Sequence, residues 1–133
     1  MPGRFGGDVS SQQAWQALAQ DPAAVLVDVR TPKEWDQVGV PDLSSLGRPV
    51  IQLDWQRFPP DERPQKFTAA IAAQGVTPEH HVFVICRSGA RSKAAGEALA
   101  GCGYTTFNVA DGFEGKPTIP GGWKRAGLPY RHH

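Results

Sequence analysis

Short apolar runs and helical repeats alternate along the chain. Four runs rich in β-branched and aromatic residues have the length of strands, and the stretches between them repeat their apolar positions as helices do. The predicted strands cover residues 25–28, 50–53, 82–85 and 104–109, and the predicted helices cover residues 12–19, 65–73 and 92–100. Strands that alternate with helices form a parallel sheet with helices on both faces. The pattern therefore predicts an α/β fold.

The chain has the size of one domain. Its 133 residues are enough for one hydrophobic core. We expect a single domain over residues 9–130, preceded by a flexible, glycine-rich N-terminus over residues 1–8 that could hold a short edge strand before Val9. The twelve prolines and fifteen glycines gather between the predicted elements, so they indicate turns rather than disorder.

Charge and composition exclude several classes of protein. The net charge of +1 argues against nucleic-acid binding through bulk electrostatics. No apolar run approaches the ~18 residues of a membrane span, and residues 1–7 lack the apolar segment of a secretory signal. The two cysteines form neither a disulfide framework nor a zinc pattern. We therefore expect a cytoplasmic protein that has no nucleic-acid or membrane partner and keeps its cysteines reduced.

The segment around Cys86 carries the chemistry. Cys86 ends a predicted strand, a loop with a glycine follows, and a helix begins near Ser92. Such a loop turns backbone N–H groups inward, and the helix adds the positive end of its dipole. Arg87, Arg91 and Lys93 add positive charge without an acidic neighbour. An activated thiolate in this setting indicates group transfer involving an anion. The alternative is an inert cysteine at a strand end, beside a solvated basic helix start.

Three separated motifs resemble one family. Residues 86–92, Cys-Arg-Ser-Gly-Ala-Arg-Ser, resemble the active-site loop of the rhodanese family of sulfurtransferases. Asp28 and Arg30, followed by an acidic and an aromatic residue, resemble its second landmark. The chain also ends as members of this family do, with a short helix that bears Trp123 and then residues 126–129, Ala-Gly-Leu-Pro. The resemblance implies a single rhodanese domain with a five-stranded parallel sheet flanked by helices on both faces.

The resemblance implies a sulfurtransferase that needs no metal or organic cofactor. In this family the cysteine takes a sulfane sulfur as a persulfide and hands it to a thiophilic acceptor, so Cys86 would be catalytic. A small anionic donor such as thiosulfate and a thiol or protein acceptor would be its partners. The residues expected to bind the donor or stabilise the persulfide form the rest of the loop: Arg87, Ser88, Gly89, Ala90, Arg91 and Ser92.

Asp28 and Arg30 are expected to support the site. Asp28 lies at the carboxyl end of a predicted strand, where α/β proteins place their sites, and could orient loop amides or an arginine. We expect Arg30 to pair with Glu34, while Thr31 caps a short helix that starts at Pro32. Plain structural bonding of Asp28 and Arg30 is an equal alternative.

Loop length separates the rival functions. Arg91 lies five positions after Cys86, giving Cys-x4-Arg, whereas phosphatases on this scaffold need Cys-x5-Arg to hold a phosphate. Position 92 is a serine, which cannot supply the guanidinium fork. Sulfur transfer is therefore preferred over a phosphatase or arsenate reductase. A non-turnover sulfur carrier or persulfide-binding module remains a further alternative.

Several other residues are not expected to take part in the chemistry of Cys86. Many family members carry a histidine in the loop that corresponds to residues 38–42, and this chain has none there. His80 and His81 precede the cysteine strand, so we expect them at the far end of the sheet. Trp55 follows a strand and is expected to pack ordinarily rather than reach the cysteine, and Cys102 is expected to be a bystander.

Overall fold

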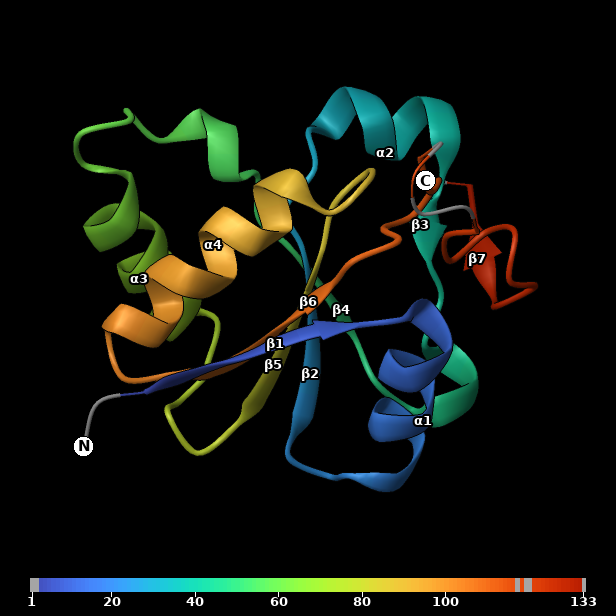
Figure 1. The fold of residues 1–133 in the computed structure, drawn as a ribbon, viewed down its shortest axis with the longest axis horizontal. Helices are drawn as coiled ribbons and strands as arrows, with labels where there is room; N and C mark the ends of the chain where they lie inside the picture. The colour runs from blue at the N-terminus through green and yellow to red at the C-terminus, as the bar shows by residue number, and fades with distance from the viewer. Residues whose placement is uncertain (1–2, 117, 119–120, 133) are drawn as a thin grey trace.

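Five parallel strands form the centre of the molecule (Figure 1). The computed structural model describes residues 3–116, 118 and 121–132. The strand order is β1-β6-β5-β2-β4, and every neighbouring pair is parallel. The middle strand, β5, is the one that precedes Cys86. The strands are β1 (Arg4–Val9), β2 (Ala24–Asp28), β4 (Val50–Gln52), β5 (His81–Ile85) and β6 (Thr105–Val109).

Helices cover both faces of this sheet, so the predicted fold class is confirmed. Figure 1 shows α3 (Arg63–Ala73) and α4 (Ala90–Gly101) on one side of the strands and α1 (Ser11–Gln20) on the other. The shorter helix α2 (Pro32–Val38) follows β2, and the 3₁₀ turns η1 (Ser44–Leu46) and η2 (Trp55–Arg57) flank β4. Within the described ranges, no helix is both long and apolar enough to cross a bilayer.

The alternation of side chains along β5 divides the core in two. Val82 and Val84 belong to one cluster with Cys86, together with residues of α3 and α4. Phe83 and Ile85 face the other way, into a cluster with residues of α1 and the C-terminal segment. Both neighbours on the sheet and both layers of cover bury this strand, which is why its sequence is a continuous apolar run. Cys86 therefore starts from a rigid position.

The helix α2 begins where its capping residues predict. The Thr31 hydroxyl accepts a hydrogen bond from the Glu34 N–H, and the Glu34 carboxylate accepts one from the Thr31 N–H, at 3.3 and 3.2 Å. Pro32 occupies the first turn, where its missing N–H costs no hydrogen bond. The predicted cap at Thr31 is confirmed, and the reciprocal bond of this capping box fixes where Glu34 points.

The N-terminal segment contributes the edge strand of the sheet. From Arg4 on, the glycine-rich segment for which we expected flexibility forms β1, which pairs in parallel with β6. The register shifts between Phe5 and Asp8, on either side of two glycines. Residues 1 and 2 lie outside the described residues. The short edge strand considered for this segment is thus present, and it places Asp8 beside Asn108.

The C-terminal segment differs from expectation because it forms turns where we predicted a short helix. Residues 123–127 are turns, and the Trp123 N–H donates to the Gly112 carbonyl at 2.8 Å. The Lys124 N–H donates to the Phe113 carbonyl at 3.2 Å. The backbone N–H groups of Trp123 and Lys124 therefore bind the loop after β6. It ends in β7 (Tyr130–Arg131), which pairs antiparallel with β3 (Val40–Pro41).

Candidate active site

Cys86 lies at the junction between the central strand and α4. Cys86 is only 1% exposed. Its carbonyl accepts a hydrogen bond from the Phe113 N–H at 2.8 Å, and the carbonyl of Arg87 accepts one from the Glu114 N–H at 3.0 Å. Because the N–H of a trans peptide points opposite to its carbonyl, the N–H groups of Arg87 and Ser88 point away from residues 113–114. The loop after β6 thereby sets the orientation of the cysteine loop.

Gly89 brings a backbone donor to the sulfur. Its N–H donates to Cys86 Sγ over 3.1 Å. Gly89 has φ +102°, and a Cβ there would lie 2.4 Å from the Ala110 carbonyl oxygen, so a side chain would both strain the backbone and clash. The next residues begin α4, whose first amides have no intrahelical partner. The predicted strand, glycine loop and helix are thus present, and they direct the Gly89 N–H toward the sulfur.

A chain of side-chain hydrogen bonds leads from the sulfur to the edge of the sheet. Cys86 Sγ lies 3.2 Å from Ser92 Oγ, and both groups are buried. The Ser92 hydroxyl donates to Asn108 Oδ1 on β6. The Asn108 amide group in turn donates to Asp8 Oδ1 on β1, over 2.9 Å. The cysteine is therefore coupled to a carboxylate two strands away.

Both arginines of the loop are paired with carboxylates. Arg91 forms a bidentate pair with Glu34, with Nη1–Oε1 at 2.7 Å and Nη2–Oε2 at 2.9 Å. The side chain of Arg87 is 65% exposed, and its Nε lies 3.2 Å from Glu114 Oε2. The local excess of positive charge in the sequence is therefore offset by acidic residues from α2 and from the loop after β6.

The Arg91–Glu34 pair shifts the protonation of both groups. Burial of the Glu34 carboxylate by itself would raise its pKa. Hydrogen bonds from Arg91 and Thr31 and the positive charge of Arg91 outweigh burial and lower the pKa from 4.5 to about 2. The hydrogen bond to Glu34 raises the pKa of Arg91. At neutral pH the pair is fully charged and holds α2 against the start of α4.

We expect this pair to make stability depend on acidic pH. The folded-state pKa of Glu34 is lowered, so its contribution to the free energy of unfolding is complete above pH 4.5 and is lost as the pH falls toward about 2. Urea unfolding at pH 7 and pH 3 should show a smaller loss of stability at pH 3 for Glu34→Gln than for the wild type. Arg91→Ala should behave in the same way, because it removes the partner. A wild-type pH dependence in both variants would contradict this role.

Asp28 and Arg30 pair with each other, so the predicted Arg30–Glu34 pair is wrong. Arg30 Nη2 donates to Asp28 Oδ2 at 2.7 Å, and both side chains are fully buried. The same nitrogen donates to the Gly39 carbonyl at 2.8 Å, and the guanidinium stacks over the Phe113 ring at 4.2 Å. Thr31, as the N-cap, ends the extended segment, so Arg30 turns inward before the helix begins. Arg30 thus joins β2, the turn before β3 and the loop after β6.

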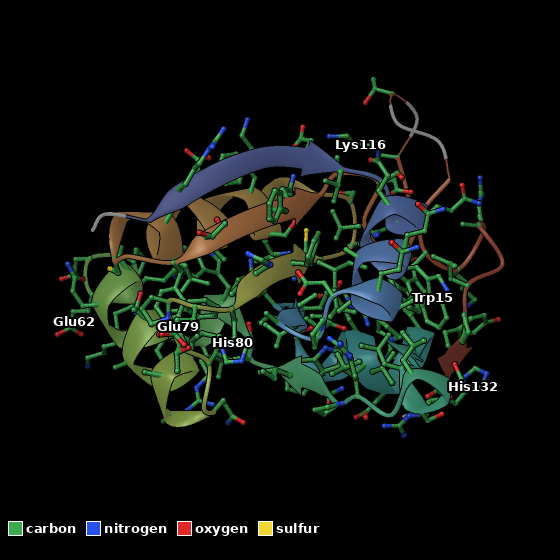
Figure 2. All side chains as sticks on the ribbon, turned by 90° about the horizontal axis from the view of Figure 1, so that it is seen from below. Trp15, Glu62, Glu79, His80, Lys116 and His132 are labelled. Carbon is green, nitrogen blue, oxygen red and sulfur yellow. The ribbon has the colours of Figure 1, made fainter. Side chains whose placement is uncertain are left out.

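The residues that we did not expect to act in the site lie away from the sulfur or make ordinary packing contacts. His80 and His81 lie at the start of β5, and Figure 2 shows His80 far from Lys116 of the loop after β6. Trp55 is buried against Phe67, with ring centroids 5.0 Å apart. Cys102 is an exposed free thiol at the end of α4.

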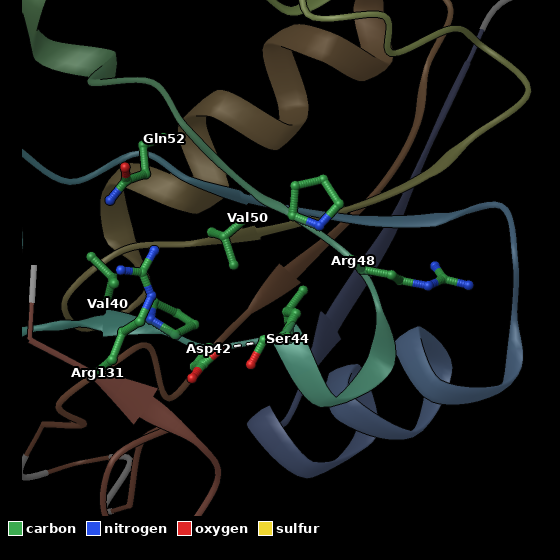
Figure 3. Close-up of a pocket in the computed structure, with 10 residues that line it drawn as sticks. Val40, Asp42, Ser44, Arg48, Val50, Gln52 and Arg131 are labelled. Carbon is green, nitrogen blue, oxygen red and sulfur yellow. Dashed lines mark hydrogen bonds between the residues drawn. The ribbon is translucent and has the colours of Figure 1, made fainter.

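Two of the pockets beside the sheet differ in their relation to Cys86. One, of about 290 Å³, opens beside the edge strand β4 and is lined by no residue of the 86–92 loop (Figure 3). The other, of about 260 Å³, opens beside β1 and includes the loop residue Gly89 in its wall. Its lining residues are Asp8, Gly89, Ala90, Lys93, Asn108, Ala110 and Lys116. The second pocket borders the hydrogen-bond chain from Cys86.

The sequence did not reveal which residues of other segments contact the cysteine loop. It did not connect Asn108 or Asp8 with the cysteine, nor Glu34 with Arg91. A signal for Asn108 was present, because it is a polar residue near the carboxyl end of an otherwise strand-forming run. Asp8 carried no such signal, since its position beside Asn108 depends on the pairing of the first strand with the last.

Comparison with known proteins places nearly the whole chain in one family. A family model described as the STR4 middle domain matches residues 6–133. An uncharacterised protein of Rickettsia conorii is 37% identical over 127 residues, which cover 93% of this chain and 96% of that protein. A sulfurtransferase of Allochromatium vinosum is 30% identical over 123 residues and 92% of each chain. A chloroplastic thylakoid rhodanese-like protein of Oryza sativa subsp. indica is 30% identical over 126 residues, 93% of this chain and 25% of that protein.

Solved structures agree with this assignment. The crystal structure of Rv0390 from Mycobacterium tuberculosis is 40% identical, covers 98% of this chain and 100% of its own, and superposes with a TM-score of 0.79. The solution structure of a polysulfide-sulfur transferase homodimer from Wolinella succinogenes is 28% identical and covers 93% of this chain and 77% of its own, with a TM-score of 0.66. By fold and by sequence, this chain belongs to the rhodanese-like family.

Proposed function

We propose that this chain is a sulfurtransferase that carries a sulfane sulfur as a persulfide on Cys86. The Cys86 thiolate attacks the outer sulfur of a donor such as thiosulfate; a new S–S bond forms, the bond to the sulfonate sulfur breaks, and sulfite leaves with its electron pair. A thiolate acceptor then attacks the outer sulfur of the persulfide and releases the Cys86 thiolate. The two steps alternate, so we expect ping-pong kinetics.

The orientation of the loop amides carries this proposal. The Gly89 N–H donates to Sγ at 3.1 Å, and the N–H groups of Arg87 and Ser88 point away from the loop that binds their carbonyl partners. Donors fixed in this way stabilise a negative charge that forms on or beside the cysteine sulfur. The residue after Arg91 is Ser92, and its small hydroxyl group contacts the sulfur directly. A single sulfur atom is the cargo that suits so tight a loop.

Relatives support sulfur transfer and suggest the class of donor. One relative is named a sulfurtransferase, and a structural neighbour is a polysulfide-sulfur transferase. We therefore propose small anionic sulfane-sulfur compounds, thiosulfate or a persulfide, as donors and a thiol or protein thiol as acceptor. Arg87 would attract the donor, because its pair with Glu114 is exposed and opens at little cost. A reducing cytoplasm would keep Cys86 available.

The test is the intact mass of the protein before and after excess thiosulfate. The wild type should gain one sulfur atom, and cyanide should remove it. Cys86→Ala should gain none, whereas Cys102→Ser should gain as much as the wild type, because Cys102 is exposed at the other end of α4. Sulfur uptake by Cys86→Ala, or no uptake by folded wild type from either thiosulfate or a persulfide donor, would overturn the proposal.

Burial of the site favours one alternative, a sulfur carrier that does not turn over. Cys86 is 1% exposed and Arg91 is held by Glu34, so small acceptors have limited access. A carrier would load once and release sulfur slowly to cyanide or small thiols, but quickly to a protein partner. Hydrolysis of an aryl phosphate, which the short loop argues against, would instead identify a phosphatase.

A further inference from the structure

The direction of each hydrogen bond between Cys86 and Asp8 can be deduced. A carboxylate only accepts, so the Asn108 group that faces Asp8, over 2.9 Å, is the NH₂. The Asn108 oxygen therefore faces Ser92, and the single hydroxyl hydrogen of Ser92 is donated to it. What Ser92 presents to Cys86, over 3.2 Å, is an oxygen lone pair. That lone pair accepts from a thiol S–H.

The same geometry opposes a thiolate. If Cys86 loses its proton, the Ser92 lone pair faces a negative sulfur. Ser92 can turn its hydrogen toward the sulfur only by leaving the Asn108 oxygen without a donor, and Asn108 is only 3% exposed. An unsatisfied buried acceptor costs free energy. The Gly89 N–H and the start of α4 act in the opposite sense and favour the thiolate.

We propose that Asn108 and Asp8 are positioning residues that keep the Ser92 hydrogen turned away from Cys86 and so hold the resting sulfur in its thiol form. The proposal rests on the proposed function only in taking Cys86 as the reacting sulfur. Asp8 acts through the orientation of the Asn108 amide rather than through its own charge. Release of the Ser92 hydrogen toward the sulfur then accompanies activation of the nucleophile.

Other charged groups near the site must be separated from this effect. They come from the loop and α4, from the end of β2, from α2 and from the loop after β6: Arg87, Arg91, Lys93, Asp28, Arg30, Glu34, Glu114 and Lys116. A variant at position 8 that loses the negative charge but keeps an acceptor oxygen shows whether Asp8 acts by orienting the Asn108 amide or by its own charge. Asp8→Asn keeps such an oxygen, and Asp8→Ala does not.

The experiment is the rate of alkylation of Cys86 by iodoacetamide as a function of pH, in the whole 133-residue chain carrying Cys102→Ser so that only Cys86 reacts. Asn108→Leu and Asp8→Ala should each react about tenfold faster at pH 7, with the rate profile moved to lower pH, because Ser92 can then donate to the thiolate. Asp8→Asn should restore the wild-type profile. Asp8 is exposed on the edge strand, so its variants leave the core intact.

Two controls make the result specific. Thr106 lies two residues before Asn108 on the same strand and is buried, but its hydroxyl donates to the Gly96 carbonyl, at 2.7 Å. Thr106→Val loses a comparable buried hydrogen bond and should leave the profile unchanged. In a Ser92→Ala background the Asn108 and Asp8 variants should have no effect.

Three results would overturn the proposal: an unchanged profile in Asn108→Leu and Asp8→Ala, an equal shift in Thr106→Val, or a shift that persists without the Ser92 hydroxyl. A shift in Asp8→Asn equal to that in Asp8→Ala would likewise overturn the orientation role, since it would point to charge. Alkylation needs no sulfur donor. A wild type that fails to load sulfur would therefore contradict the proposed function and leave this test intact.

Discussion

Replacing Arg30 with methionine is expected to lower the free energy of unfolding by about 3–5 kcal/mol, the range for breaking a buried ion pair by removing one partner. Asp28 would remain as a buried carboxylate without its guanidinium partner, since both side chains are fully buried. The variant would also lose the hydrogen bond to the Gly39 carbonyl and the stacking on Phe113. A loss of this size is a large part of the ~5–15 kcal/mol that stabilises a typical domain.

Urea unfolding of Arg30→Met beside Arg87→Met is the matched measurement. Arg87 makes the same kind of ion pair, with Glu114, but its side chain is 65% exposed, so its loss should cost no more than about 1 kcal/mol. The double variant Asp28→Leu, Arg30→Met should recover part of the stability, because it removes the buried charge as well. Equal stabilities for Arg30→Met and Arg87→Met would show that burial of the Arg30 pair is unimportant.

Trp123→Ala should cost about 3–5 kcal/mol, the usual range for truncating a fully buried tryptophan. Trp123 is 0% exposed, packs edge-on against Trp15, and donates from Nε1 to the Pro129 carbonyl at 2.7 Å. The backbone N–H of Trp123 also donates to the Gly112 carbonyl, next to the residues that orient the Cys86 loop. We therefore expect the variant to load sulfur more slowly as well as to unfold more easily.

Two variants separate the causes of that loss. Trp15→Ala removes the other ring of the pair from a half-buried position, so its stability loss in urea unfolding should be clearly smaller. Trp123→Phe keeps most of the apolar area and removes the Nε1–H donor, so its cost should be about 1 kcal/mol. If Trp123→Ala unfolded no more easily than Trp15→Ala, the C-terminal segment would not anchor the loop after β6.

Local features explain what could be predicted. The strand before Cys86, the helix after it and the capping box at Thr31 all depend on residues within one element, and each is present in the structure. The predicted pairing of Arg30 with Glu34 failed because Arg30 lies before the N-cap Thr31 and turns inward to Asp28. Glu34 found its partner 57 residues away, in Arg91, and no local pattern contains that separation.

The main helices and strands between residues 11 and 109, the parallel sheet and the place of Cys86 at the end of a buried strand were determined by the sequence alone, because hydrophobic periodicity and turn residues act over a few positions. The partners of the charges and the chain from Cys86 through Ser92 and Asn108 to Asp8 were decided only by the tertiary structure. The reason is the strand order β1-β6-β5, which sets Asp8 against Asn108, 100 residues later, and Asn108 one strand from the cysteine.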